Sequence, residues 1–261
     1  MKKYYNFINE ETISGRRIDD ILDDVFDRCK PYIDIIKSCD GQRLLFRGFN
    51  FKGEDIKDDV LLSIYAEKHI TIKEIKHRWN RIPLDTPEEI HDLLNTKFVE
   101  KFGWEARNGV FCYLKDATHN TSTGYGVPYM IFPIGDFEYL WSPNVFDLYG
   151  DNQAEIEMYM NQDEYFDELI EEDWESHCDG DNELYNNQEE LQKFIDMRME
   201  TFNTDFIEHL DSLVNTYKDT DICKTTQVRE ITLNCDSYYL IDKLYLDNIK
   251  KRIWGKEENP Q

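Results

Sequence analysis

Long apolar runs are missing from this sequence of 261 residues. No stretch approaches the ~20 consecutive apolar residues that a membrane-spanning helix requires. The first residues, MKKYYNFINEE, also lack the apolar segment of a signal peptide. We therefore expect a cytoplasmic protein without a membrane partner, which stays in the compartment where it is made.

Cysteine is present but follows no pattern. No CxxC pair occurs, and the cysteines are too sparse for a disulfide framework, which argues against a structural zinc site as well. We expect no bound metal, and we expect reduced thiols at all six positions, which are Cys29, Cys39, Cys112, Cys178, Cys223 and Cys235.

Basic residues are in the minority. The chain has 30 Lys and Arg against 54 Asp and Glu, for a net charge of −24, which excludes nucleic-acid binding through the surface as a whole. Thirteen acids fall between residues 155 and 183 with no Lys or Arg among them. Such a block is first of all a solvated face or a mobile excursion, and secondly a surface for a basic partner.

Apolar residues are sufficient for a folded core, at 40% of the chain with 14% aromatic residues. Helical spacing and end signals predict helices over 17–38, interrupted near Pro31, over 85–103 and over 187–218. Asp85 or Thr86 is expected to cap the second of these helices and Gly103 to end it. Short apolar runs bounded by turn residues predict strands at 43–49, 108–116, 127–135, 136–143 and within 225–246.

This order of elements predicts an α+β fold with mainly antiparallel strand pairing. We treat residues 1–261 as one domain, with N-terminal helices at 11–40 and an acidic helical insertion at 150–220. The sequence contains no glycine fingerprint of a dinucleotide-binding βαβ unit and no P-loop. The histidines are scattered, and we expect most of them at the surface.

Three charged residues stand inside predicted apolar strands. Arg47 lies in RLLFRGF, Glu138 in DFEYLW and Glu230 in QVREITL. A buried charge needs a partner or a function, so Arg47 either pairs with an acid or holds an anion. Glu230 either faces outward, paired with Arg229 or a lysine, or serves in catalysis. Gly48, next to Arg47, permits a ligand to approach the strand closely.

Three segments occur in an order that resembles the ADP-ribosyltransferase fold, and specifically a bacteriophage ADP-ribosyltransferase-like family. LLFRG has an arginine on an early strand, RNGVFCYLKDATHNTSTGYG is similar to the second strand and the helix after it, and REITLNCDSYYLID has a glutamate on a late strand. The resemblance covers residues 43–149 and 224–242. It implies a mixed or antiparallel split β-sheet with flanking helices, and a site with the order Arg, Ser/Thr, Glu.

The resemblance implies that NAD is a substrate and that Glu230 is the catalytic acid. Breaking the bond between nicotinamide and ribose develops positive charge on the ribose, which a carboxylate stabilises. Arg47 is expected to hold the diphosphate, because a guanidinium can donate two parallel hydrogen bonds to it. Aromatic rings are expected against the nicotinamide. The NAD-binding set that the resemblance suggests is Arg47, Gly48, Arg78, Arg81, Arg107, Phe111, Ser122 and Tyr125.

The chain departs from the family pattern at two places. Cys112 and Tyr113 stand where the family has Ser-Thr, and Val228 stands two residues before the glutamate. The first hypothesis is a phage-encoded enzyme that transfers ADP-ribose from NAD to a host protein or nucleic acid in the host cytoplasm. The alternative is a non-enzymatic acidic interaction protein or inhibitor, such as a nucleic-acid mimic, built on a degenerate transferase fold. In that case the segment 155–183 binds a basic partner.

Overall fold

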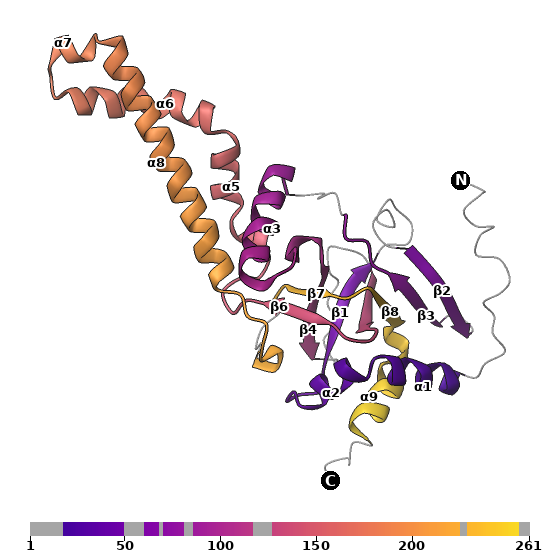
Figure 1. Ribbon diagram of the computed structural model, residues 1–261. Coiled ribbons are helices and arrows are strands. Elements are labelled where there is room, and N and C mark those ends of the chain that lie inside the picture. Colours follow the sequence, from indigo (N-terminus) through magenta and orange to yellow (C-terminus); the bar gives the residue numbers. More distant parts are fainter. Residues whose placement is uncertain are drawn as a thin grey trace, which may run out of the picture.

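An antiparallel sheet forms the body of the protein in the computed structural model (Figure 1), which describes residues 18–49, 60–67, 70–80, 86–116, 127–224 and 229–255. Within these ranges the sheet has eight strands in the order β2-β3-β8-β5-β1-β4-β7-β6. The predicted α+β class and antiparallel pairing are confirmed. The strands are β1 (Arg43–Phe49), β2 (Val60–Glu67), β3 (Ile70–Lys76), β4 (Val110–Asp116), β5 (Val127–Pro133), β6 (Glu138–Trp141), β7 (Ile231–Asn234) and β8 (Ser237–Asp242).

Helices from both ends of the chain pack together against the sheet. They are α1 (Ile18–Arg28), α2 (Lys30–Lys37) and α9 (Leu246–Trp254), and the predicted interruption falls at Cys29, just before Pro31 in the first turn of α2. Arg252 of α9 forms ion pairs with Asp19 and Asp23 of α1. The main apolar core lies between these helices and the sheet, and it includes Leu22, Tyr32, Leu45, Phe132, Ile241 and Ile249.

The helix α3 (Glu88–Phe102) and the short helix η2 (Ala106–Asn108) lead into β4. Gly103 ends α3 as predicted, in the left-handed conformation at φ 83° that glycine adopts without strain. The N-cap residue is Pro87, which has no side-chain hydrogen-bonding group, so the predicted cap Thr86 is wrong; Thr86 is buried, and Asp85 lies outside the described residues.

A helical arm projects from the sheet (Figure 1), and the acidic block forms part of its solvated surface, with Glu155, Glu175 and Glu183 exposed. It contains α4 (Leu148–Asp151), α5 (Gln153–Met160), α6 (Gln162–Cys178), α7 (Asn182–Tyr185) and α8 (Gln188–Asn215), so the helix predicted over 187–218 is confirmed. Asn187 caps α8 by accepting hydrogen bonds from the backbone of Glu189 and Glu190. Trp174, Cys178 and Phe194 form a small core of the arm's own. Neither α8 nor any other helix in the described ranges is long and apolar enough to cross a membrane.

One pair of cysteines overturns the expectation of six reduced thiols. Cys39, just after α2, forms a disulfide with Cys223 in the short helix η3 (Ile222–Lys224), with Cα atoms 4.9 Å apart. Their separation of 184 residues leaves no signal in sequence spacing, because only the fold brings these two loops together. The remaining four cysteines are buried and form no disulfide among the described residues.

Candidate active site

Three neighbouring strands bring Arg47, Cys112 and Glu230 to one part of the sheet. Arg47 is on β1, Cys112 is on β4 next to it, and Glu230 immediately precedes β7, where Ile231 pairs with Cys112. Burial raises the pKa of the Cys112 thiol well above its usual value, while Arg47 lowers it and Glu230 raises it. Alternation along the strands places Arg47 on the same face as Cys112 and Ile231, whereas Phe111 lies on the opposite face with Thr232.

Glu230 forms a buried ion pair with Arg107. The Nη1 atom of Arg107 lies 3.0 Å from Oε1 of Glu230, and the two side chains are only 8% and 15% exposed. The guanidinium also lies 4.7 Å from the ring centroid of Phe111, within the range of a cation–π interaction. Two members of the predicted site, Phe111 and Glu230, thus each contact a third, Arg107.

The position of Arg107 follows from the way η2 is held. The backbone N–H of Arg107 donates to Oδ1 of the buried Asn95 on α3, at 2.8 Å. On the next residue, the carbonyl of Asn108 accepts a 2.7 Å hydrogen bond from Nε2 of His77. His77 is buried for this reason, and His91 is buried on the inner face of α3, so the expectation of surface histidines is wrong for both.

Gly109 allows η2 to lie directly on β7. A Cβ atom at this position would come 2.8 Å from the carbonyl oxygen of Leu233 and would overlap the side chain of Thr232. Only glycine therefore permits this approach. In the sequence, the glycine of Arg107-Asn108-Gly109 just before β4 indicates this contact between η2 and β7. Gly109 therefore helps to place Arg107 beside Glu230.

A polar row continues from Arg47 to the other half of the sheet. Arg47 pairs in register with Tyr129 on β5, and Tyr129 pairs with Asp242 on β8, so the three share one face. Lys73 on β3 reaches the same place: its Nζ donates to the Tyr129 hydroxyl at 3.4 Å and lies 4.6 Å from the ring centroid. Burial lowers the pKa of Lys73 to about 8, with Asp242 acting in the opposite direction.

Sequence reasoning missed Lys73 and misjudged Glu138. Lys73 lies in ITIKEIK, within a stretch that looks charged and irregular, and its signal is the β-branched ITI before it. Glu138 was expected to be buried, but β6 is an edge strand and its carboxylate is exposed, where it accepts a 2.6 Å hydrogen bond from Asn234.

The other predicted site residues are less informative. Gly48 pairs with Pro128 of β5 next to Arg47, and Arg78 is exposed after the end of β3. Arg81, Ser122 and Tyr125 lie outside the described residues. In the part of the chain that the structure describes, no cluster of His, Cys, Asp and Glu is arranged to hold a metal ion.

No protein-family model matches this chain. Comparison with curated proteins and with solved structures likewise gives no match.

Proposed function

We propose that this protein is an NAD-dependent ADP-ribosyltransferase with its active site across β1, β4 and β7. The observations that carry the proposal are the buried ion pair of Glu230 with Arg107, whose guanidinium also lies over Phe111, and the position of Arg47 on β1, 183 residues before Glu230 (230 minus 47). The strands β1 and β7 are the immediate neighbours of β4. This strand arrangement agrees with the Arg, Ser/Thr, Glu order of the family that the sequence resembles, and we extend the proposal to the fold of that family.

The chemistry assigns a separate task to each side chain. Arg47 binds the diphosphate of NAD, and the ring of Phe111 packs against the nicotinamide. The bond between nicotinamide and ribose C1′ breaks, and its electron pair leaves with the nicotinamide. Glu230 accepts a hydrogen bond from the ribose 2′-hydroxyl and stabilises the positive charge that develops on the sugar. A nucleophile of the acceptor then bonds to C1′ and loses its proton.

Two neighbours support Glu230 without reacting themselves. Arg107 fixes the orientation of the carboxylate through the 3.0 Å ion pair. Cys112 takes the place of the family's Ser/Thr, and burial keeps its pKa high, so the thiol stays neutral and is not a nucleophile.

The test measures nicotinamide release and transfer of label from tagged NAD in the presence of cell extract. We expect wild-type protein to release nicotinamide and to label an acceptor, and Glu230→Gln to lower the rate about 100- to 1000-fold. Arg107→Gln is the matched control, because it breaks the same ion pair but keeps the carboxylate, and it should lose less activity. Urea unfolding of both variants separates loss of chemistry from loss of fold.

Two results would count against the proposal at different levels. Full activity of Glu230→Gln would remove the site assignment but leave the enzyme class standing. Absence of nicotinamide release by the wild-type protein, with and without extract, would remove the enzyme class.

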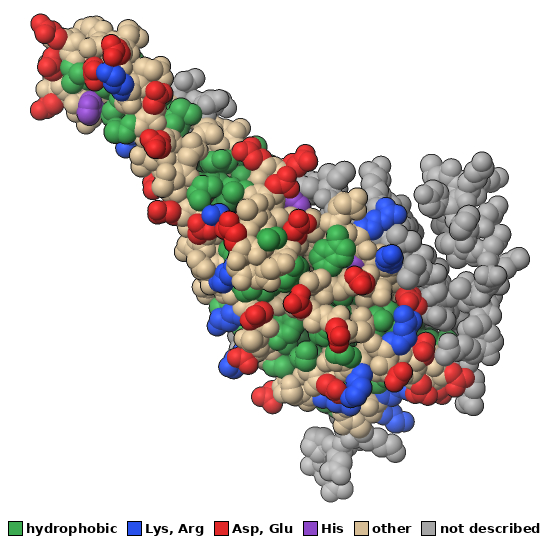
Figure 2. Space-filling view, viewed as in Figure 1, with side chains coloured by type: hydrophobic (Ala, Val, Ile, Leu, Met, Phe, Trp, Pro, Cys, Tyr) green, Lys and Arg blue, Asp and Glu red, His purple; other side chains and the backbone are tan. Residues whose placement is uncertain are grey.

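A second function, that of an acidic interaction protein, is favoured by the charge of the arm. Residues 153–215 contain 20 Asp and Glu against two Lys and Arg, so they carry −18 of the net charge of −24. Acidic side chains are spread along the arm in Figure 2. This function needs a basic partner and is indifferent to Glu230→Gln, so salt-sensitive binding that survives this substitution supports it.

A further inference from the structure

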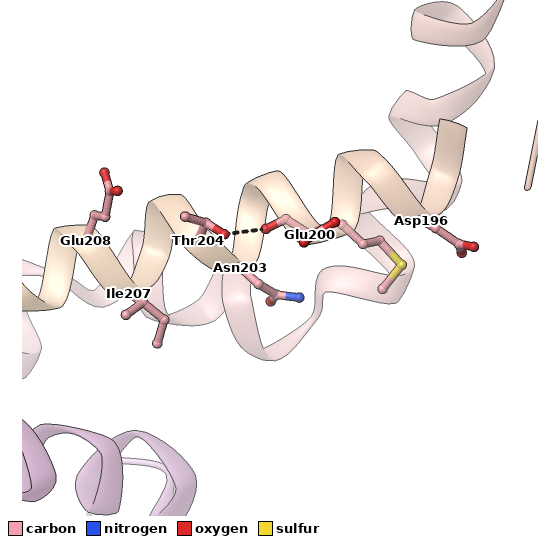
Figure 3. A pocket seen from close by; sticks show the side chains of 7 residues that line it. Asp196, Glu200, Asn203, Thr204, Ile207 and Glu208 are labelled. Atoms are coloured by element: carbon pink, nitrogen blue, oxygen red, sulfur yellow. Dashed lines mark hydrogen bonds between the residues drawn. The ribbon is translucent and has the colours of Figure 1, made fainter. Parts of the chain in front are cut away.

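A groove of about 600 Å³ runs along one side of α8 (Figure 3). Its described lining comes from that helix alone, at positions three or four residues apart that share one face. The stripe spans roughly 18 Å, at about 1.5 Å per residue. The lining residues are Asp196, Met199, Glu200, Asn203, Thr204, Ile207 and Glu208.

The groove combines an apolar floor with acidic edges. Met199 and Ile207 are half-buried, while the carboxylates of Asp196, Glu200 and Glu208 are exposed. These three acids lie four and eight residues apart, so Glu200 is rotated about 40° from Asp196 around the helix axis and Glu208 about 120° from Asp196. A complementary segment therefore needs apolar side chains in the middle and cations beside them.

Asn203 adds an acceptor at the centre of the groove. Its Oδ1 atom is buried and has no hydrogen-bond partner among the residues that the structure describes. The neighbouring Thr204 hydroxyl already donates to the backbone carbonyl of Glu200, at 2.8 Å. Because a buried acceptor without a donor is costly, Asn203 favours a partner that brings an N–H or O–H group to this point.

The cations of the arm are engaged elsewhere. Between residues 153 and 215 these are Lys193 and Arg198. Lys193 lies 2.9 Å from carboxylate oxygens of both Glu189 and Glu190, and Arg198 pairs with Asp173 on α6. The positive charge that complements the groove must therefore come from a partner.

We propose that the α8 groove binds a basic amphipathic helix of a partner protein. Apolar side chains of that helix cover Met199 and Ile207, and its Lys or Arg side chains pair with Asp196, Glu200 and Glu208. A helix can present apolar and basic side chains three and four residues apart, which is also the spacing of the groove residues on α8. Nucleic acid and acidic peptides are disfavoured by repulsion from residues 153–215, which carry a net charge of −18. The proposal refines the second function above and is independent of NAD chemistry.

The probe is a fluorescein-labelled helical peptide with leucines on one face and lysines on both flanks, and binding is followed by fluorescence anisotropy. The groove variant Asp196→Asn/Glu200→Gln/Glu208→Gln should weaken binding about tenfold or more. The matched control Glu175→Gln/Glu183→Gln/Asp205→Asn removes the same charge from exposed acids of the arm outside the groove, and it should weaken binding about threefold or less.

The apolar floor is tested separately with Met199→Ser/Ile207→Ser, which should weaken binding while leaving its salt dependence unchanged. The proposal is overturned if the wild-type protein does not bind the peptide, if the two charge variants lose equal affinity, or if the floor variant binds like wild type. Circular dichroism establishes that each variant retains the helices. Glu230→Gln should bind the peptide normally, so failure of the NAD hypothesis leaves this result unaffected.

Discussion

Lys73 is a buried cation whose folded pKa, about 8, lies below its usual value because of burial. Below pH 8 the lysine is protonated in both the folded and unfolded states. The folded state is then destabilised by the full free energy of burying the charge. Between pH 8 and about 10.4 the unfolded state binds more protons, so this residue's contribution to stability rises with pH. Relative to Lys73→Met, the wild-type protein should gain about 2 kcal/mol of unfolding free energy between pH 7.5 and 10.

Urea unfolding of both proteins at the two pH values measures this gain. Tyrosines and thiols far from Lys73 titrate equally in both proteins. Their contribution therefore cancels when the unfolding free energy of Lys73→Met is subtracted from that of the wild-type protein. A difference that does not change with pH would show that Lys73 titrates normally in the folded protein.

For single residues, reasoning from the sequence identified the charged residues of interest but not the residues with which they pair. Arg47 and Glu230 were detectable because each interrupts an apolar run, and their strands β1 and β7 both neighbour β4. Glu230 had many possible cationic partners, and nothing in the spacing selected Arg107. The choice depends on Gly109, which brings η2 onto β7, and such a contact is set by three-dimensional packing.

The contact between η2 and β7 is the element-level feature that positions Arg107. Gly109→Ala places a methyl group against the Leu233 carbonyl and the Thr232 side chain, so η2 must move away from the strand. We expect a loss of about 1–3 kcal/mol of stability and separation of Arg107 from Glu230. Urea unfolding reports the first effect, and the rate of nicotinamide release reports the second.

Gly103→Ala is the control for this prediction. Gly103 has a positive φ but open space around it, so alanine there strains the end of α3 without pushing on β7. It should cost about 1 kcal/mol and leave the site intact. If Gly109→Ala were no more harmful than Gly103→Ala, the close approach of η2 would not be what holds Arg107.

Prediction of the elements succeeded where the hydrophobic period was regular. It placed β1, α3 and α8 because their apolar residues repeat at one spacing and their ends carry clear signals. It missed β3, whose Ile72, Lys73 and Ile75 are all buried, so that no alternation of apolar and polar residues marks the strand. It predicted a helical insertion over 150–220 but not the separate helices α5 and α6, because their many acids obscure the few buried residues, such as Ile156 and Trp174, that anchor the arm.

For the whole molecule, the Cys39–Cys223 disulfide links the segment after α2 to the segment that precedes β7. It closes a loop with a sequence separation of 184 residues, so it restricts the unfolded chain strongly. Reduction should lower the free energy of unfolding by about 2–5 kcal/mol. Thermal unfolding with and without reductant measures this, and Cys39→Ser/Cys223→Ser should be insensitive to reductant. Equal midpoints for oxidised and reduced wild-type protein would contradict the prediction.

The sequence predicted the fold class but not the order of the strands. Alternation and turn signals are local properties, so they indicate that strands exist and leave open which strand lies beside which. The neighbours β1, β4 and β7 are set by the packing of the entire core. The site could therefore be suggested by three short motifs, whereas its assembly depended on contacts between distant parts of the chain.

The strand order also decides when a newly synthesised chain can fold. Six strands have been synthesised once Trp141 is added, but β7 and β8 come only after the arm, 90 residues later (231 minus 141). At about 5–20 residues per second this is a delay of roughly 5–20 s. Until then the sheet exists as three pieces, β2-β3, β5-β1-β4 and β6, with open edges that can pair with other chains. The arm is thus complete before the body of the protein that carries it.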